Sequence, residues 1–261
     1  MGKENFIMAY PEDLLSTRAI IEHGRYALIP PEGLVNNQLP FFEKCTTSII
    51  ASPKLGASFV QYLIEMEPEG KTTKPFGGNG IESFVFVREG ALDVIVDNEK
   101  YELTQGGYVY CPPHLGMTLE NNSKSNTKLI LYKQKYIAVE GLPKPWVVCN
   151  NINNLEARIY EGMEDVTLID LLPTDMAFDM NMHILTFQPG GSHPFIETHV
   201  QEHGAYLLSG QGIYYLDNKW IPVKKGDFIW MGPFIQQATY AVGHEPLSYI
   251  YSKDCNRDAE I

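Results

Sequence analysis

The sequence predicts an all-β protein made of two β-barrel domains of one kind in tandem. From Lys54 onward, short runs rich in β-branched and aromatic residues alternate with Gly, Pro, Asn and Asp. Such evenly spaced strands with turn residues between them are typical of a sandwich or barrel. No sustained helical periodicity interrupts them. The second half of the chain also repeats the first, which indicates a duplicated domain.

The predicted strands fall into two groups, and Pro143-Lys144-Pro145-Trp146 lies between them as a linker. We therefore expect an N-terminal extension over residues 1–55, an N-terminal barrel over 56–142 and a C-terminal barrel over 146–261. The strands of the first group are expected at 57–64, 83–87, 92–96, 108–111 and 128–132, and those of the second at 166–170, 180–187, 205–208, 212–216, 227–231 and 248–251.

The N-terminal extension carries no chemistry that its sequence reveals. Residues 11–23 could hold a short helix, because Pro11 suits a first helical turn. Pro30, Pro31 and Gly33 mark loops, and His23 is expected at the surface.

The repeat has a constant offset of 120 residues. At this offset Glu82 falls on Glu202 and Gly90 on Gly210. The turn Asp97-Asn98 likewise falls on Asp217-Asn218, and 106–113 falls on 226–233. Turn residues that match without a gap over about 30 positions are strong support for two related domains.

The composition of the chain argues against several functional classes of protein. Of the 261 residues, 44% are hydrophobic and 20% charged, as in an ordinary globular protein. The net charge of −12 argues against nucleic acid or an anionic membrane as a partner, because both need a basic surface. The N-terminus is too short and charged for a signal peptide, and no apolar run could span a bilayer. Four scattered cysteines without a CxxC pair indicate reduced thiols, so we expect a cytoplasmic protein.

Four candidate ligand side chains lie within seven residues, namely Glu197, His199, Glu202 and His203. Glu197, His199 and His203 have the same parity, so an extended segment would direct all three toward one point, whereas Glu202 would point away. Two imidazoles and a carboxylate suit a divalent first-row metal and leave positions open for substrate or water. The alternative is a polar patch on a solvated strand.

The duplication supplies an internal comparison for this site. At the 120-residue offset, Glu197, His199 and His203 correspond to Gly77, Asn79 and Ser83. The first barrel therefore has the scaffold without the ligands and should bind no metal. A purely structural role for the three residues is weakened, because the sister domain is expected to fold without them.

These residues resemble the two characteristic motifs of the cupin superfamily, whose members are double-stranded β-helix barrels that hold a divalent metal. The usual first motif reads G-x5-H-x-H-x3,4-E-x6-G, and the second reads G-x5-P-x-G-x2-H-x3-N. Here the segment from Gly191 to Gly210 follows the first spacing, and Gly226 to Gln237 follows the second. The ligand types are changed, since Glu197 replaces the first His, His203 the Glu and Gln237 the second-motif His.

The changed ligand set resembles the (S)-ureidoglycine aminohydrolases, a family of bicupins whose N-terminal barrel has lost its ligands. Matching stretches cover most of the chain, including 178–185, 197–206, 216–226 and the tail from Tyr249 to Ile261. The resemblance implies manganese-dependent hydrolysis of (S)-ureidoglycine to (S)-ureidoglycolate and ammonia in purine-ureide breakdown. It also implies the metal ligands Glu197, His199, His203 and Gln237 and the substrate contacts Glu197, Gln237, Tyr249 and Lys253.

The chemistry of these residues suits such a substrate. Lys253 is a cation for the substrate carboxylate and shares a strand face with Tyr249. Glu197 could take a proton from water and return one to the leaving amine, so Glu197, Lys253 and Tyr249 are the expected catalytic residues. Tyr214 could line the pocket or belong to the core. His183 is expected on a strand and His193 in a loop, neither as a ligand.

Two other functions stay open at the level of sequence. A cupin dioxygenase would use the same two-His, one-carboxylate set for non-haem iron, and would need oxygen. A ureide-sensing binding module would bind its ligand without releasing ammonia. In each case the expected partner is a small molecule, and the exposed faces of duplicated barrels favour a homo-oligomer.

Overall fold

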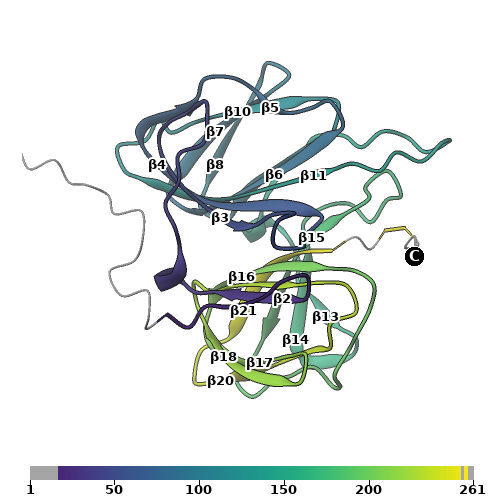
Figure 1. The fold of residues 1–261 in the computed structure, drawn as a ribbon. Coiled ribbons are helices and arrows are strands. Elements are labelled where there is room, and N and C mark those ends of the chain that lie inside the picture. Colours follow the sequence, from purple (N-terminus) through teal and green to yellow (C-terminus); the bar gives the residue numbers. More distant parts are fainter. Residues whose placement is uncertain (1–16, 254–255, 258–261) are drawn as a thin grey trace, which may run out of the picture.

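The computed structural model describes residues 17–253 and 256–257 and confirms the predicted all-β fold. Two barrels are stacked on each other, the N-terminal one in purple to teal and the C-terminal one in green to yellow (Figure 1). Regular helix in the described residues is limited to two short 3-10 turns, η2 at Pro31–Gly33 and η3 at Ile152–Asn154. No helix among these residues is long and apolar enough to cross a membrane.

The N-terminal barrel is a single antiparallel sheet in which the strands follow the order β12-β9-β6-β11-β4-β10-β7-β8, with β3 paired to β4 and β5 to β10. Its strands are β3 (Phe42–Ala51), β4 (Phe59–Thr72), β5 (Phe76–Gly77), β6 (Ile81–Glu89), β7 (Ala91–Val96), β8 (Glu99–Thr104), β9 (Gly107–Cys111), β10 (Gly116–Glu120), β11 (Thr127–Lys135) and β12 (Val148–Asn151).

The C-terminal barrel consists of two sheets with the orders β1-β2-β19-β16-β21-β15-β14-β13 and β18-β17-β20. Its strands are β1 (Ile20–Glu22), β2 (Tyr26–Ile29), β13 (Arg158–Tyr160), β14 (Met163–Asp170), β15 (Asn181–Phe187), β16 (His203–Ser209), β17 (Gln211–Leu216), β18 (Lys219–Lys224), β19 (Phe228–Met231), β20 (Gln237–Val242) and β21 (Leu247–Lys253).

The two barrels exchange strands. β2 comes from the N-terminal segment but pairs with β19 of the C-terminal barrel, with Phe228 opposite Ile29. β12 follows the predicted linker but pairs with β9 of the N-terminal barrel. Since each barrel completes its sheet with a strand from the other side of the linker, residues 17–55 are an integral part of the fold. No local pattern in the sequence predicted this exchange.

The duplication is visible in the strand register. Ser83 lies opposite Cys111 in the pair β6–β9, and His203 lies opposite Met231 in the pair β16–β19, 120 residues later in both strands. The hairpins after β7 and β17 turn through Asp97-Asn98 and Asp217-Asn218, and all four residues have positive φ. Positive φ at both central positions is the requirement of a type I′ hairpin turn, which explains why these pairs match.

The expectation of a helix within residues 11–23 is wrong for the part that the structure describes, because Ile20–Glu22 forms β1 and pairs with β2. Tertiary pairing of Ile20 opposite Leu28 outweighs the weak helical pattern here. Residues 11–16 lie outside the described residues. Cys45, Cys111 and Cys149 are free thiols as expected, and Cys255 is also outside the described part.

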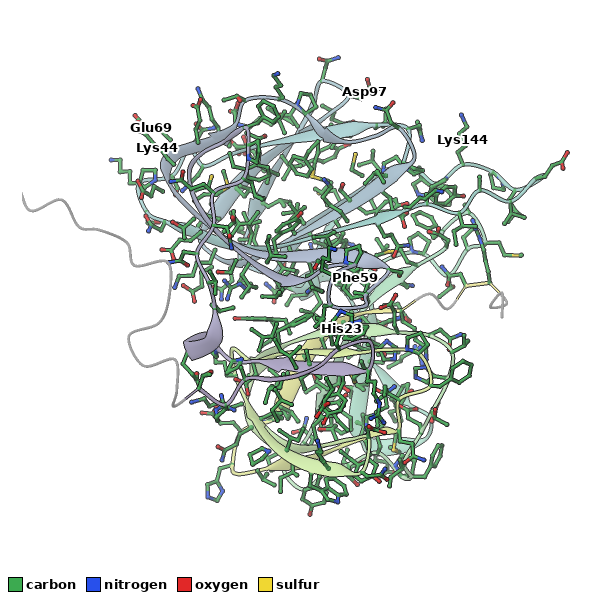
Figure 2. The ribbon with its side chains drawn as sticks, viewed as in Figure 1. His23, Lys44, Phe59, Glu69, Asp97 and Lys144 are labelled. Atoms are coloured by element: carbon green, nitrogen blue, oxygen red, sulfur yellow. The ribbon has the colours of Figure 1, made fainter. Side chains whose placement is uncertain are left out.

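An aromatic core joins the barrels. Phe59, labelled in Figure 2, lies between them and is 1% exposed. It belongs to one apolar cluster with Phe84 and Tyr110 from the first barrel and Phe178 and Trp230 from the second. Each barrel interior forms a separate apolar cluster. The shared cluster holds the two halves as one unit and fixes the strands that carry the site.

A buried carboxyl group lies at this junction. Glu82 on β6 accepts hydrogen bonds from the Tyr110 hydroxyl at 2.5 Å and the Gln134 amide at 2.6 Å. Burial, and then the neighbouring charge of Asp179, raise the pKa of Glu82 well above its ordinary value. Asp179 lies in the second half of the chain and accepts a hydrogen bond from the Ile137 amide at 2.7 Å. Because Glu82 keeps its proton, the two neighbouring carboxyl groups between the barrels do not both carry a negative charge.

We expect Glu82→Gln to flatten part of the pH dependence of stability. Because the folded pKa is raised, the folded protein keeps a proton that the unfolded chain releases above about pH 4.3. The free energy of unfolding of the wild type therefore falls as pH rises, by up to about 1.4 kcal/mol per pH unit, until the folded pKa is passed. Glu82→Gln should gain relative stability over this window in urea titrations. Glu99→Gln on the surface removes the same charge and is the control. Parallel curves for Glu82→Gln and wild type would contradict the assignment.

Candidate metal centre

The segment before β16 is held against β20 by isolated pairings. Ser192 lies opposite Tyr240, and Glu197 lies opposite Gln237 with both backbone hydrogen bonds at 2.9 Å. The sequence predicted a short extended, ligand-bearing segment. The structure has a loop with two such bridges, and regular strand starts only at His203. Pairing with β20 brings the Glu197 and Gln237 side chains together, although they are far apart in sequence.

The segment from Gly191 to Gly210, which follows the first cupin motif, must end in a glycine. Gly210 has a φ of +70° between β16 and β17, and a Cβ atom there would lie 2.4 Å from the carbonyl oxygen of Pro246. Both the conformation and the contact exclude a larger residue. The same turn recurs at Gly90 in the first barrel, with a φ of +88°.

Two imidazoles meet at the centre of the site. The Nδ1 atoms of His199 and His203 lie 2.9 Å from the carbonyl oxygens of Gln201 and Ser252. A carbonyl only accepts hydrogen bonds, so both Nδ1 atoms carry the proton and both Nε2 atoms present lone pairs. The two Nε2 atoms are 3.2 Å apart. Two lone pairs at this distance repel each other unless a cation lies between them.

Burial makes a proton a poor candidate for that cation. Burial lowers the pKa of His199, and it lowers the pKa of the fully buried His203 well below its ordinary value. The positive charge of Lys253 acts in the same direction on both rings. Both imidazoles are therefore neutral near pH 7, which is the form that binds metals.

Gln237 and Glu197 complete the set of predicted ligands. The Gln237 amide nitrogen lies 2.9 Å from His199 Nε2, and a half-turn of the amide would present its oxygen instead. Burial raises the pKa of Glu197, and Lys253 counteracts this. Among the residues that the structure describes, no three His, Cys, Asp or Glu side chains converge closely enough to hold a metal on their own. The fit to a metal thus depends on the imidazole pair and the amide, with Glu197 beside them.

A small cavity adjoins these ligands. Its volume of about 10 Å³ is roughly what one water molecule needs. Tyr249, Tyr251 and Lys253 line it from alternate positions of β21, which confirms that Tyr249 and Lys253 share a strand face. Tyr214 also lines it, and its hydroxyl lies 3.4 Å from that of Tyr249. The question left open for Tyr214 is thus resolved, since it is both buried and part of the site.

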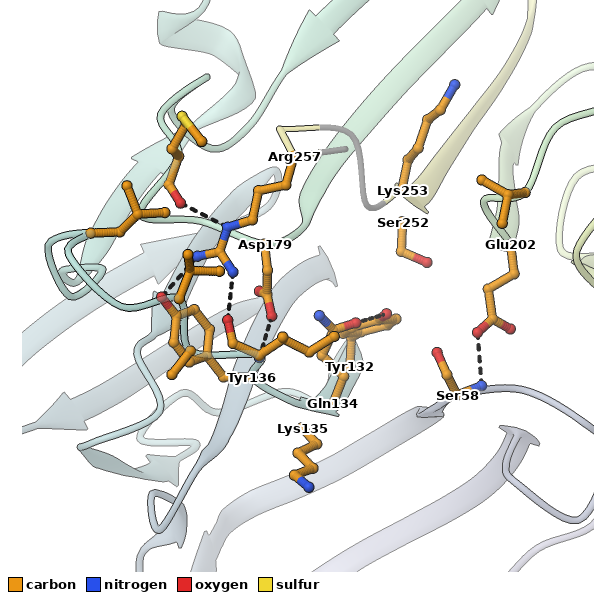
Figure 3. A pocket seen from close by; sticks show the side chains of 16 residues that line it. Ser58, Tyr132, Gln134, Lys135, Tyr136, Asp179, Glu202, Ser252, Lys253 and Arg257 are labelled. Carbon is orange, nitrogen blue, oxygen red and sulfur yellow. Dashed lines mark hydrogen bonds between the residues drawn. The ribbon is translucent and has the colours of Figure 1, made fainter. Parts of the chain in front are cut away.

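A second cavity, of about 960 Å³, lies between the barrels and is lined by Ser58, Glu202, Ser252 and Lys253 among others (Figure 3). It contains none of the four predicted metal ligands. We place the chemistry at the smaller cavity, because three of the four predicted ligands, Glu197, His203 and Gln237, line it. Lys253 lines both cavities.

Of the other three residues considered in the sequence analysis, Glu202 and His183 lie outside the small cavity and His193 lines it. Glu202 points away from the imidazoles as expected, and it accepts hydrogen bonds at 2.8 Å from the Ser58 amide and the Trp230 indole. His183 lies on β15 and contacts Asp170 at 2.9 Å. His193 lies in a loop, as expected, but its ring lines the small cavity.

Sequence reasoning missed three polar residues of the cavity, namely His193, Tyr160 and Tyr251. Tyr251 has the same strand parity as Tyr249 and Lys253, so that signal was present. His193 is four residues before Glu197, but its place in the cavity follows from pairing with β20. Tyr160 on β13 had no local signal.

Comparison with known proteins supports this architecture. A family model of the cupin domain matches residues 62–132 and 183–252. The chain is 54% identical over 262 residues to "(S)-ureidoglycine aminohydrolase" of Escherichia coli (strain K12), covering 100% of both chains. It is 32% identical to the protein of that name from Arabidopsis thaliana, covering 93% of this chain and 79% of the relative. The crystal structure of protein Ylba from E. coli superposes with a TM-score of 0.85 at 52% identity, over 97% of this chain and 100% of that one.

Two related barrels in one chain, each matched by the cupin-domain model, define this protein as a bicupin. The family match is specific, since the identity extends over the whole chain and is not confined to the cupin motifs. The chain belongs to the (S)-ureidoglycine aminohydrolase family, a family of hydrolytic enzymes.

Proposed function

We propose that this protein hydrolyses (S)-ureidoglycine to (S)-ureidoglycolate and ammonia with the help of Mn²⁺. Homology supports a hydrolytic role in ureide degradation. The main support for a bound metal is the pair of neutral imidazoles, whose Nε2 atoms lie 3.2 Å apart with their lone pairs facing each other. The homo-oligomer and the cytoplasmic location expected from the sequence remain predictions.

Glu197, His199, His203 and Gln237 would hold the metal, with an oxygen of Gln237 turned toward it. When bound, Mn²⁺ supplies a Lewis acid that can orient the substrate or increase the acidity of water. A neutral amide in place of an imidazole gives the metal a weaker donor, which favours Lewis-acid chemistry over redox chemistry. This donor set supports the hydrolytic function over the dioxygenase that the sequence alone left open.

The polar side chains around the small cavity suit one carboxylate of a small ureide, while the ureide itself is larger than this cavity and would extend toward the larger one, which Lys253 also lines. Lys253 donates charge-assisted hydrogen bonds to the substrate carboxylate. Tyr249 is fully buried, and burial raises its pKa well above the ordinary value, so its hydroxyl keeps its proton and acts as a donor. The Tyr214 hydroxyl beside it helps to orient that donor.

Glu197 transfers the protons in the proposed reaction. The reaction forms a bond from carbon to the oxygen of water and breaks the bond from carbon to the α-amine. Glu197 accepts a proton from the water and delivers a proton to the departing amine, so that ammonia leaves and the carboxylate is regenerated. Its raised pKa, caused by burial, makes it a stronger base than a carboxylate in water.

The proposal is tested by removing and restoring the metal. Freshly generated (S)-ureidoglycine is offered to the chelator-treated protein, and ammonia and the chirality of ureidoglycolate are followed, because the substrate also decays by itself. We expect activity to be lost on stripping and restored by Mn²⁺, with the (S)-product formed. The same assay without oxygen should give the same rate. A rate no faster than spontaneous decay with a loaded site, or a need for oxygen, would contradict the proposal.

A further inference from the structure

His193 is a buried histidine that the proposed chemistry does not use. Its side chain is only 5% exposed, and its ring contacts the Phe187 ring edge-on at a centroid distance of 5.0 Å. It lines the small cavity together with Glu197 and Gln237. Burial of a polar ring at this position calls for partners on both of its nitrogens.

One nitrogen of this ring has a fixed role. The backbone N–H of Thr239 on β20 donates a hydrogen bond to His193 Nδ1 at 2.9 Å. Nδ1 is therefore an acceptor and carries no proton, so the ring is neutral and its proton is on Nε2. The backbone also anchors the residue, since the His193 N–H donates to the Thr239 carbonyl at 3.0 Å.

The other nitrogen lies beside the proposed proton carrier. His193 Nε2 is 3.6 Å from Oε1 of Glu197. This separation is slightly longer than a hydrogen bond, and such contacts commonly shorten when substrate binds. Thr239 and Gln237 belong to the same strand, so β20 fixes the His193 ring and the bridge partner of Glu197 together.

We propose that His193 is a positioning residue that holds the Glu197 carboxyl group by donating its Nε2–H to Oε1. With one oxygen held, the carboxyl group cannot rotate freely, and Oε2 is the atom left for the metal or the transferred proton. Outer partners of this kind commonly contribute 10- to 100-fold in metal affinity or activity. The kinetic consequence rests on the proposed function, whereas the position of the proton does not.

The proton position is tested first, on metal-free protein with ¹⁵N-labelled histidine. Long-range ¹H–¹⁵N NMR spectra at neutral pH should show His193 protonated at Nε2 and unprotonated at Nδ1, with its signals identified by their loss in His193→Asn. Because neither metal nor substrate is present, this result is independent of the proposed function. A proton on Nδ1, or on both nitrogens, would overturn the inference.

Two variants then separate the two roles of the ring. An Asn oxygen can replace Nδ1 and keep the Thr239 bond, but its side chain is too short to reach Glu197. A Gln amide can reach Glu197 from the position of Nε2 and loses the Thr239 bond. We expect His193→Asn to weaken Mn²⁺ binding and to lower kcat by about 10- to 100-fold each. His193→Gln should recover most of both losses.

A purely structural histidine would give the opposite order. In that case His193→Asn would equal or exceed His193→Gln in Mn²⁺ affinity, measured by titration with Mn²⁺ alone, and the two would differ only in thermal stability. Melting curves of both variants check that each is folded. His244→Asn, at an exposed position after β20, is the control for histidine loss in general. If the protein proved inactive on the ureide, the Mn²⁺ titration would still decide the role of His193.

Discussion

Replacing Glu197 by Gln is expected to lower kcat by about 1,000-fold, because the proposed general base and acid is lost while the shape of the side chain is kept. Ammonia release at saturating substrate and saturating Mn²⁺ measures the effect. The bridge between Glu197 and Gln237 uses backbone atoms only, so the substitution should leave the local fold intact.

The metal concentration separates the two roles assigned to Glu197. If the residue were only a ligand, higher Mn²⁺ would restore the rate of Glu197→Gln, since an amide oxygen can still bind the metal. Loss that persists at saturating Mn²⁺ indicates proton transfer. Glu164→Gln, at an exposed position on β14, removes the same charge without approaching the site and should keep the wild-type rate. Full activity of Glu197→Gln would place the proton carrier elsewhere.

Replacing Lys253 by Met is expected to raise KM strongly, with a fall of about 10- to 100-fold in kcat/KM. Met keeps the length and packing of the side chain but cannot bind the substrate carboxylate. A hydrogen bond to a charged group contributes about 1.5–3 kcal/mol, which corresponds to this range. Steady-state kinetics with the ureide, over a range that reaches saturation, provide both constants.

The duplication offers a matched control for Lys253. Lys133 is its counterpart 120 residues earlier, on β11, and its Nζ lies over the Phe76 ring at 5.6 Å. Lys133→Met makes the same chemical change in the N-terminal barrel, where Gly77, Asn79 and Ser83 stand at the positions of the predicted ligands, and should leave kcat/KM near the wild-type value. Equal losses in both variants would show that the effect is one of stability or net charge. A change confined to kcat in Lys253→Met would assign the lysine to proton transfer instead of carboxylate binding.

Much of the architecture follows from local pattern. Each run of β-branched and aromatic residues that predicted a strand overlaps one, because these side chains fit a pleated, half-buried surface. The predicted starts at Ala57, Met180 and Asp227 lie one or two residues before β4, β15 and β19. The constant offset of the turns predicted the duplication, since hairpins with positive φ require particular residues at fixed positions. The parity of Tyr249 and Lys253 likewise placed both side chains on one face of β21.

The sequence alone determined the all-β fold, the repeat and the ligand-bearing segment, since these are encoded within a few neighbouring residues. Only the tertiary structure decided which strands complete each barrel, as β2 and β12 cross to the other half. It also decided that a backbone bridge joins Glu197 to Gln237, a pairing that the motif resemblance had implied only as shared ligands, and that His193 enters the cavity. These contacts join β20 to a loop some 40 residues earlier in the chain, and long-range backbone pairing of this kind leaves no periodic signal in the sequence.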